Sequence, residues 1–264
     1  DLSYLAQLAG CKFVFVPDVA VPAELPTHMT AFKSQQHRWA KGSTQTCLKV
    51  LPVLLRSSLS YRIKAEACFH LAANFNYLLL MPFCVLLVPV MVVRHYYGAA
   101  SGMALVDYLL LSAAMLSIAN FYLVSQCELT SNWWRRCFDI PALIALSLGL
   151  SVNNAAAVIE ALMGRTGDFV RTPKYGNDAM GRCKPGYGNT VSWLVWVEMG
   201  FGVYFTGAVI FAVAVELYMA VPFLILFQLG FLYASVGSLT QQSAPEGALP
   251  TSSSPRLFAT GVWE

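Results

Sequence analysis

The chain has 264 residues, of which 57% are hydrophobic and only 12% are charged, and its formal net charge is +3. Its mean hydropathy of +0.57 lies far from that of an average soluble protein. These values exclude an ordinary soluble globular domain and indicate an integral membrane protein or a piece of one.

Residues 1–67 are predicted to be the C-terminal end of an α/β domain. Residues 2–9 have helical character and end at Gly10, a natural helix C-cap. Residues 13–16 form a short apolar run before a proline, which is typical of a buried strand, and the extended piece 18–25 follows. A complete nucleotide-binding domain usually needs ~100 residues or more. We therefore expect the remainder to lie upstream of this chain.

The most informative motif is Q-x-x-R-W, in a helix expected to start after Pro26 and Thr27, which together look like a stop followed by an N-cap. Gln35, Arg38 and Trp39 are at positions i, i+3 and i+4, so a helix presents them on one face. A guanidinium binds phosphate oxygens in pairs, and a flat aromatic ring stacks on a sugar ring. This face suits a nucleotide-sugar diphosphate and a carbohydrate acceptor. The alternative is an interfacial helix that Arg38 and Trp39 merely anchor at the lipid headgroups.

Residues 68–237 form the predicted membrane region, because a spanning helix needs roughly 20 apolar residues and four segments are that long and that apolar. The third of them contains Glu198, and an intramembrane acid is a functional candidate by default. Its expected partner is a glycan hydroxyl, unless the side chain snorkels to the nearby membrane boundary. The predicted spans are residues 69–93, 103–127, 191–215 and 217–237.

A further apolar run, residues 140–161, is predicted to lie along the membrane interface as an amphipathic helix. If it does so, four spans place both chain ends and nearly all basic loops in the cytoplasm, as the positive-inside rule requires. If it crosses the bilayer, the basic loop at residues 163–185 moves outside and the rule is broken. We therefore expect a multi-pass protein of the cell inner (plasma) membrane with both ends cytoplasmic.

The loop at residues 163–185 carries a second cluster, the sequence F-V-R-T-P-K that begins at Phe169 and is flanked by glycines. Glycine and proline at these positions suit a hinged surface loop. Lys174 and Arg171 are suited to contact phosphate, and Thr172 can donate a hydrogen bond to it. The alternative is a basic loop that touches anionic lipid.

The start of the chain, the helix with Q-x-x-R-W and the F-V-R-T-P-K loop resemble membrane-bound family 2 glycosyltransferases of the bacterial cellulose synthase-like type. The resemblance covers residues 1–237, and the order of motif helix, two spans, interface helix, loop and two spans also fits. It implies a mainly α, multi-pass membrane protein that begins with the remnant of a GT-A-type α/β catalytic domain. It also implies transfer of a sugar from a nucleotide-sugar, most often a UDP-sugar, to a growing β-glycan with inversion, and translocation of that glycan.

The same resemblance implies roles for the motif residues. Gln35 and Arg38 would bind the donor diphosphate, and Trp39 would stack on the acceptor sugar. A gating loop would close over the bound nucleotide, and its matching residues are Phe169, Arg171, Thr172 and Lys174. Arg171 departs from the valine that is usual in bacterial cellulose synthase.

Two parts of the family pattern are not found in this sequence. No D-x-D pair occurs, so the ligands of the expected Mg²⁺ or Mn²⁺ ion and the catalytic base, an Asp in a T-E-D type motif, are expected upstream of Asp1. The chain by itself is therefore expected to be inactive. Its seven cysteines form no C-x-x-C pair, which argues against a zinc site. Residues 238–264 are rich in Ser, Pro and Thr and are predicted to be disordered.

Two other functions fit the sequence. A non-processive glycosyltransferase that adds one sugar to a membrane lipid shares these motifs, so the acceptor is either a glycan or a lipid. A non-enzymatic transporter or channel also has several spans, although the inverted repeats typical of transporters are not seen. The expected partners are a nucleotide-sugar, the acceptor and membrane lipids, with no nucleic acid.

Overall fold

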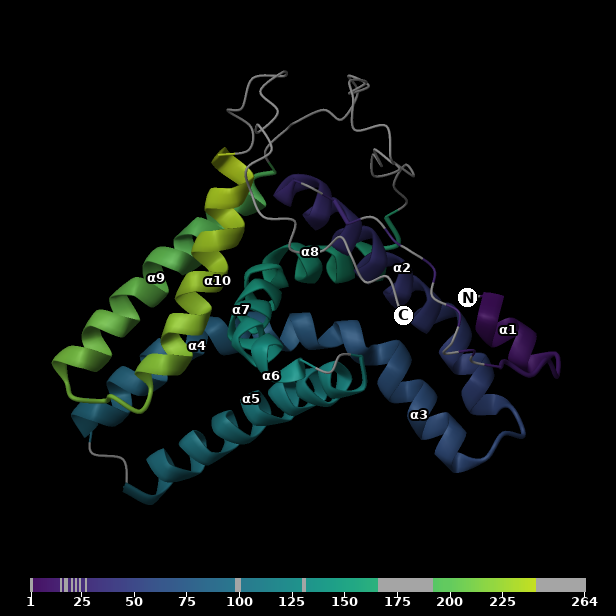
Figure 1. Ribbon diagram of the computed structural model, residues 1–264, viewed down its shortest axis with the longest axis horizontal. Helices are drawn as coiled ribbons and strands as arrows, with labels where there is room; N and C mark the ends of the chain where they lie inside the picture. Colours follow the sequence, from purple (N-terminus) through teal and green to yellow (C-terminus); the bar gives the residue numbers. More distant parts are fainter. Residues whose placement is uncertain are drawn as a thin grey trace.

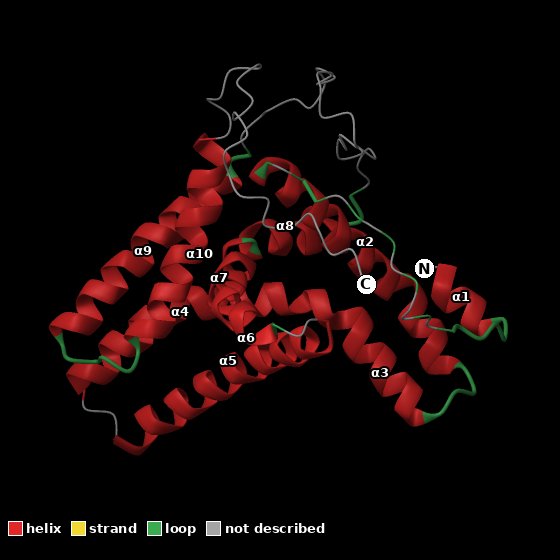
Figure 2. Ribbon diagram, viewed as in Figure 1, coloured by secondary structure: helices red, strands yellow, loops and turns green. Residues whose placement is uncertain are grey.

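The computed structural model describes residues 2–14, 16, 19, 21, 23, 25–26, 28–97, 101–129, 132–165 and 192–240, except for the side chains of 101–104, 107 and 108. Every regular element within these residues is a helix, and none of them lies in a strand (Figure 2). The protein is a mainly α, multi-pass membrane protein, as predicted. The elements are α1 Leu2–Leu8, α2 Met29–Arg56, α3 Tyr61–Ala72, η1 Ala73–Phe75, α4 Asn76–Tyr97, α5 Ser101–Leu129, α6 Trp133–Arg136, η2 Cys137–Asp139, α7 Ile140–Gly149, α8 Ser151–Leu162, α9 Leu194–Ala214 and α10 Val221–Thr240.

Four helical segments in the described part of the chain are long and apolar enough to cross a membrane, and they overlap the four predicted spans. The largest difference is in the first one, which begins at Tyr61 rather than at residue 69, because α3, η1 and α4 form one continuous 37-residue segment. A helix of that length spans about 55 Å, whereas the hydrocarbon core is about 30 Å thick. Its ends therefore extend beyond the bilayer core. The segments are Tyr61–Tyr97, Leu109–Leu129, Leu194–Ala214 and Val221–Thr240.

The helices α9 and α10 form an antiparallel pair joined by a short turn (Figure 1). Aromatic rings fill the space between them: Phe205 stacks on Phe227 with 4.9 Å between ring centroids, and Phe231 stacks on Phe201 at 5.0 Å. Phe205, Phe227 and Phe231 are almost completely buried. Stacked rings contribute dispersion and quadrupole interactions beyond the area they bury, so this pair forms the centre of the membrane core.

The helix α7 packs against α10 through glycines. A Cβ atom added at Gly149 would lie 2.1 Å from the carbonyl oxygen of Gly230, and one added at Gly230 would lie 2.1 Å from the carbonyl oxygen of Ala145. Membrane helices use small residues in this way to bring their backbones together. The two glycines therefore set the distance between α7 and α10.

The interface helix predicted at residues 140–161 is two helices. α7 and α8 meet at Leu150 with a bend of 42°. The reason is tertiary, because α7 packs against α10 while α8 packs against α2. Together with α6 and η2, which precede it, the bent pair is also long and apolar enough for a fifth span, from Trp133 to Leu162, so its position relative to the membrane stays a prediction.

Two other local predictions need correction. Residues 13–16 were expected to form a buried strand, but the described residues of this segment are not in a strand, and Phe13 and Val14 are 61% and 82% exposed. A strand needs a hydrogen-bonded neighbour, and the described residues offer none. The motif helix begins after His28, not after Thr27 as predicted, and it continues past Pro52. Gly10 does end the first helix with a positive φ of 90°, as its C-cap role requires.

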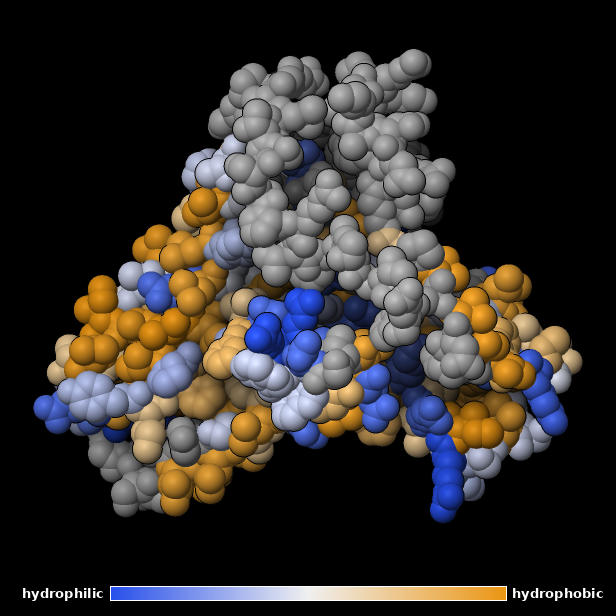
Figure 3. Space-filling view, in the orientation of Figure 1, coloured by the Kyte–Doolittle hydropathy of each residue, from blue (hydrophilic) through white to orange (hydrophobic). Residues whose placement is uncertain are grey.

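Hydrophobic side chains cover much of the outer surface in Figure 3, over α9 and α10 in particular. Exposed examples on these two helices include Trp196, Ile210 and Tyr233. An apolar surface of this extent is unfavourable in water and is what lipid-facing helices require.

Candidate functional site

The three residues of the Q-x-x-R-W motif lie on one helix, α2, as predicted. Trp39 is 62% exposed, whereas Gln35 and Arg38 are half-buried. Gln35 Oε1 is buried, and it accepts no hydrogen bond from any residue that the structure describes. A carboxamide offers both an acceptor for a sugar hydroxyl and donors for a phosphate oxygen. The side chains therefore offer an amide, a cation and an exposed indole to a ligand.

A second face of α2 holds the helix in place. The side chains of Lys33, His37 and Lys41 recur every fourth residue and all reach toward the membrane helices. Since successive residues of an α-helix are about 100° apart, this face is turned by about 150° from the Q-x-x-R-W face. α2 crosses α8 on this side (Figure 1). The Q-x-x-R-W residues are thus on the side of α2 that is turned away from the Glu160 contact on α8.

Glu160 on α8 is the centre of the first contact. One oxygen, Oε2, accepts a hydrogen bond from Lys41 Nζ at 2.8 Å and lies 3.2 Å from His37 Nε2. The other ring nitrogen of His37 lies 3.2 Å from the carbonyl oxygen of Asn153. Burial alone would raise the pKa of Glu160, but the hydrogen bonds from Lys41 and His37 outweigh it and lower this pKa below its usual range. Glu160 is therefore ionised at neutral pH.

Lys33 on α2 forms an ion pair with Glu198 on α9, and the two side chains are only 8% and 1% exposed. Burial lowers the pKa of Lys33, an effect that the neighbouring carboxylate opposes. Asn153 Nδ2 donates a hydrogen bond to the carbonyl oxygen of Lys33 at 3.0 Å and thus ties the same turn of α2 to α8. Glu198 was expected to meet a glycan hydroxyl or to snorkel. It does not snorkel, because Lys33 reaches it inside the protein, and a contact with a glycan hydroxyl stays a prediction.

Sequence analysis did not assign roles to Lys33, His37, Lys41 and Glu160. A signal was present, because the first three recur at i, i+4 and i+8 and therefore share one face. Glu160 is also the one charged residue between Ile140 and Leu162. The sequence could not predict which of these side chains contact each other, since the partners are 119 to 165 positions apart.

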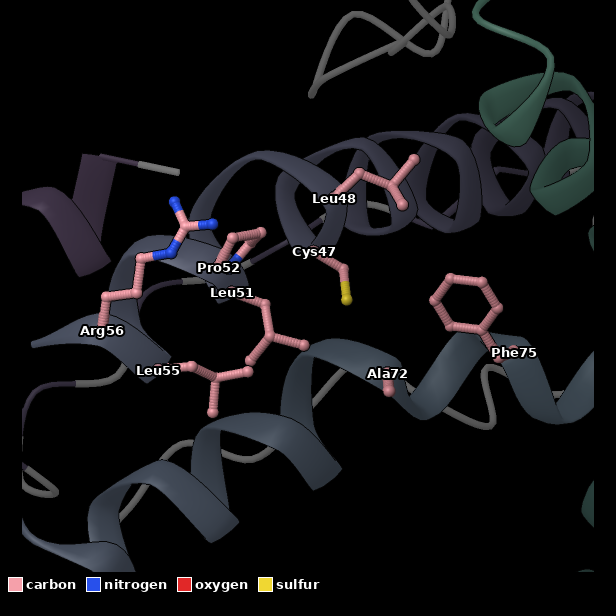
Figure 4. Close-up of a pocket in the computed structure, with 8 residues that line it drawn as sticks. All are labelled: Cys47, Leu48, Leu51, Pro52, Leu55, Arg56, Ala72 and Phe75. Atoms are coloured by element: carbon pink, nitrogen blue, oxygen red, sulfur yellow. The ribbon is translucent and has the colours of Figure 1, made fainter.

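An apolar groove of about 470 Å³ lies at the other end of α2, between this helix and the α3–η1 junction (Figure 4). Burial raises the pKa of the Cys47 thiol in its wall, so this cysteine is a neutral packing residue. Arg56 is the one charged side chain of the lining. A groove with so few polar groups does not suit a nucleotide-sugar. It is lined by Cys47, Leu48, Leu51, Pro52, Leu55, Arg56, Ala72 and Phe75.

The predicted gating loop and the predicted metal ligands are not part of the geometry described above. The gating-loop residues Phe169, Arg171, Thr172 and Lys174 lie outside the described residues. Among the residues that are described, no three His, Cys, Asp or Glu side chains come together as metal ligands. The described residues thus do not form a site for the expected Mg²⁺ or Mn²⁺ ion, and its ligands stay a prediction for residues outside this chain.

Comparison with known proteins identifies similar sequences in plants. Glucomannan 4-beta-mannosyltransferase 1 of Cyamopsis tetragonoloba is 36% identical over 97 residues, which is 33% of this chain and 18% of that protein. The protein of the same name in Oryza sativa subsp. japonica is 37% identical over 75 residues, or 28% of this chain and 14% of the relative. Probable glucomannan 4-beta-mannosyltransferase 15 of Arabidopsis thaliana is 26% identical over 215 residues, or 77% of this chain and 36% of the relative.

The chain is similar to plant glucomannan 4-beta-mannosyltransferases. These relatives support a glycosyltransferase of the cellulose synthase-like type. The alignments span only about a seventh to a third of the length of these relatives. No protein-family model and no solved structure matches the chain. The bacterial type that the motifs suggested stays a prediction.

Proposed function

We propose that this chain is the membrane-proximal part of an inverting glycosyltransferase that extends a β-glycan. The observation that carries the proposal is the geometry of α2, which presents Gln35, Arg38 and Trp39 on one side and is tied to α8 and α9 on the other. The similarity to plant mannosyltransferases supports it and suggests mannose as the transferred sugar. The donor is a nucleotide-sugar, and the motif resemblance favours a UDP-sugar.

Each motif residue has a chemical role in this proposal. The guanidinium of Arg38 binds the donor diphosphate and stabilises the negative charge that develops as it leaves. Gln35 donates to a phosphate oxygen from its amide. The exposed ring of Trp39 stacks on the acceptor sugar. The general base that deprotonates the acceptor hydroxyl and the metal ligands would come from residues outside this chain, so the chain by itself would be inactive.

The experiment that tests this proposal compares arginine variants in the full-length protein. Arg38→Ala should lower sugar transfer by about 100-fold or more, the loss typical of removing one preorganised donor to a developing charge. Arg38→Lys should retain part of the activity because it keeps the charge but loses the paired hydrogen bonds. The measurement is incorporation of radiolabelled sugar by isolated membranes from a panel of uridine and guanosine diphosphate sugars.

Arg56→Ala is the matched control, because it removes an exposed arginine at the far end of the same helix, about five turns from Arg38. Transfer by Arg38→Ala at the wild-type rate would refute the role of Arg38. The nature of the product separates the two enzymatic alternatives. A polymer that resists lipid extraction and is cut by a β-mannanase supports glycan synthesis, whereas a single-sugar glycolipid supports the non-processive reaction.

A further inference from the structure

Glu160 joins the helix that carries the motif to the membrane helices through two bonds. Its carboxylate contacts Lys41 and His37, which are one helical turn apart on α2. His37 is next in sequence to Arg38, and Lys41 follows Trp39 by two positions. A displacement of these two residues therefore displaces the motif as well.

Directional bonds hold this crossing: Asn153 on α8 contacts the carbonyl oxygen of Lys33 and the ring of His37, and Glu160 adds the side-chain contacts to His37 and Lys41. Ala40 on α2 and Ala157 on α8 are buried at or next to this contact. Apolar contacts are non-directional and allow helices to slide and rotate. Two hydrogen bonds from successive turns of α2 to one carboxylate fix both its rotation about its axis and its position along α8.

We propose that Glu160 is a positioning residue that sets the rotation and register of α2, and through it the orientation of Gln35, Arg38 and Trp39. This inference depends on the proposed function, because it assigns the orientation a role in sugar transfer. Glu160 does not itself touch the substrate. It acts through His37 and Lys41.

Energetics distinguish this role from simple stabilisation. The side chains of Glu160, His37 and Lys41 are 34%, 22% and 15% exposed, and ion pairs with this access to water contribute only about 0–1 kcal/mol to folding. Misplacing a catalytic constellation by about 1 Å can cost roughly 100-fold in rate. Loss of Glu160 should therefore reduce activity far more than it reduces thermal stability.

The test compares Glu160→Gln, Lys41→Met and the double variant in the full-length protein. We expect each single variant to lower kcat by about 10-fold to 100-fold while the melting temperature stays close to that of the wild type. The double variant should lose no more than the worse single variant, because both remove the same bond. Lys41→Arg keeps a cation within reach of Glu160 and should recover most of the rate. Glu128→Gln, which removes an exposed carboxylate on α5, is the control.

A second readout does not depend on activity. Spin labels at Gln45 on α2 and Ile159 on α8, which are both exposed, report the distance between the two helices. In a background without other cysteines, the wild type should give one narrow distance distribution, and Glu160→Gln should broaden or shift it. The Glu128→Gln protein should match the wild type.

The outcomes separate this inference from the proposed function. If the wild type transfers sugar and Glu160→Gln has an unchanged kcat, the positioning role is wrong and the proposed function stands. If the wild type transfers none of the sugars, the proposed function is wrong, and the spin-label distances still decide whether Glu160 fixes α2. An unchanged distance distribution in Glu160→Gln overturns the inference in either case.

Discussion

One ion pair and one three-residue cluster hold α2, and they differ in how much water reaches them. Lys33 and Glu198 are nearly inaccessible, whereas Glu160 and its partners are partly exposed. Desolvation is costly for a buried charge, and the buried partner is left uncompensated when one side chain is removed. The buried pair should therefore govern stability, and the exposed cluster should govern the orientation of α2.

The buried pair makes a prediction about stability. Lys33→Met should destabilise the protein by about 3–5 kcal/mol, because it leaves the Glu198 carboxylate without its partner. Adding Glu198→Leu should recover most of that loss, since two apolar side chains replace the buried ion pair. The measurement is the thermal unfolding midpoint of the detergent-solubilised protein. A double variant as unstable as the single one would show that the ion pair is not the source of the effect.

At the level of elements, the contact between α7 and α10 depends on the absence of side chains. The backbones approach so closely at Gly149 and Gly230 that neither position has space for a methyl group. Overpacking of this kind usually costs about 1–3 kcal/mol or more. The close contact between α7 and α10 also affects the bend at Leu150. α8 follows α7 directly, so the direction of α8 depends on how α7 packs against α10.

Gly230→Ala should therefore lower the thermal unfolding midpoint, because the added Cβ meets the backbone of Ala145. Gly207→Ala on α9 is the control, since a Cβ there meets nothing within 4 Å. Alanine favours a helix over glycine by about 1 kcal/mol, so the control should be as stable as the wild type or more stable. Equal stability of the two variants would contradict the close approach of α7 and α10.

At the level of the whole molecule, the prediction concerns membrane topology. If residues 140–161 do not cross the bilayer, cysteines introduced at Gln45 and Lys174 should react from the same, cytosolic side, and one at Tyr97 from the opposite side. The measurement is labelling of intact cells or sealed vesicles with a membrane-impermeant thiol reagent, in a cysteine-free background. Labelling of the first two positions from opposite sides would rule out a shared substrate pocket.

Much of this architecture could be predicted from local sequence. Length and apolarity identified the four long helices, and the i, i+3, i+4 spacing placed Gln35, Arg38 and Trp39 on one helix. The C-cap at Gly10 was also correct, because a positive φ is a local property of glycine. The expected strand at residues 13–16 was wrong, since a strand depends on a neighbour that local sequence does not contain.

The amino-acid sequence by itself determined that the chain is helical and inserts in a membrane, because hydrophobicity and helix periodicity are properties of neighbouring residues. Only the tertiary structure decided that Lys33 pairs with Glu198, that Glu160 contacts His37 and Lys41, and that the helix breaks at Leu150. These pairings join residues more than 100 positions apart. Their existence depends on how the helices pack, and packing is set by shape and close approach in three dimensions.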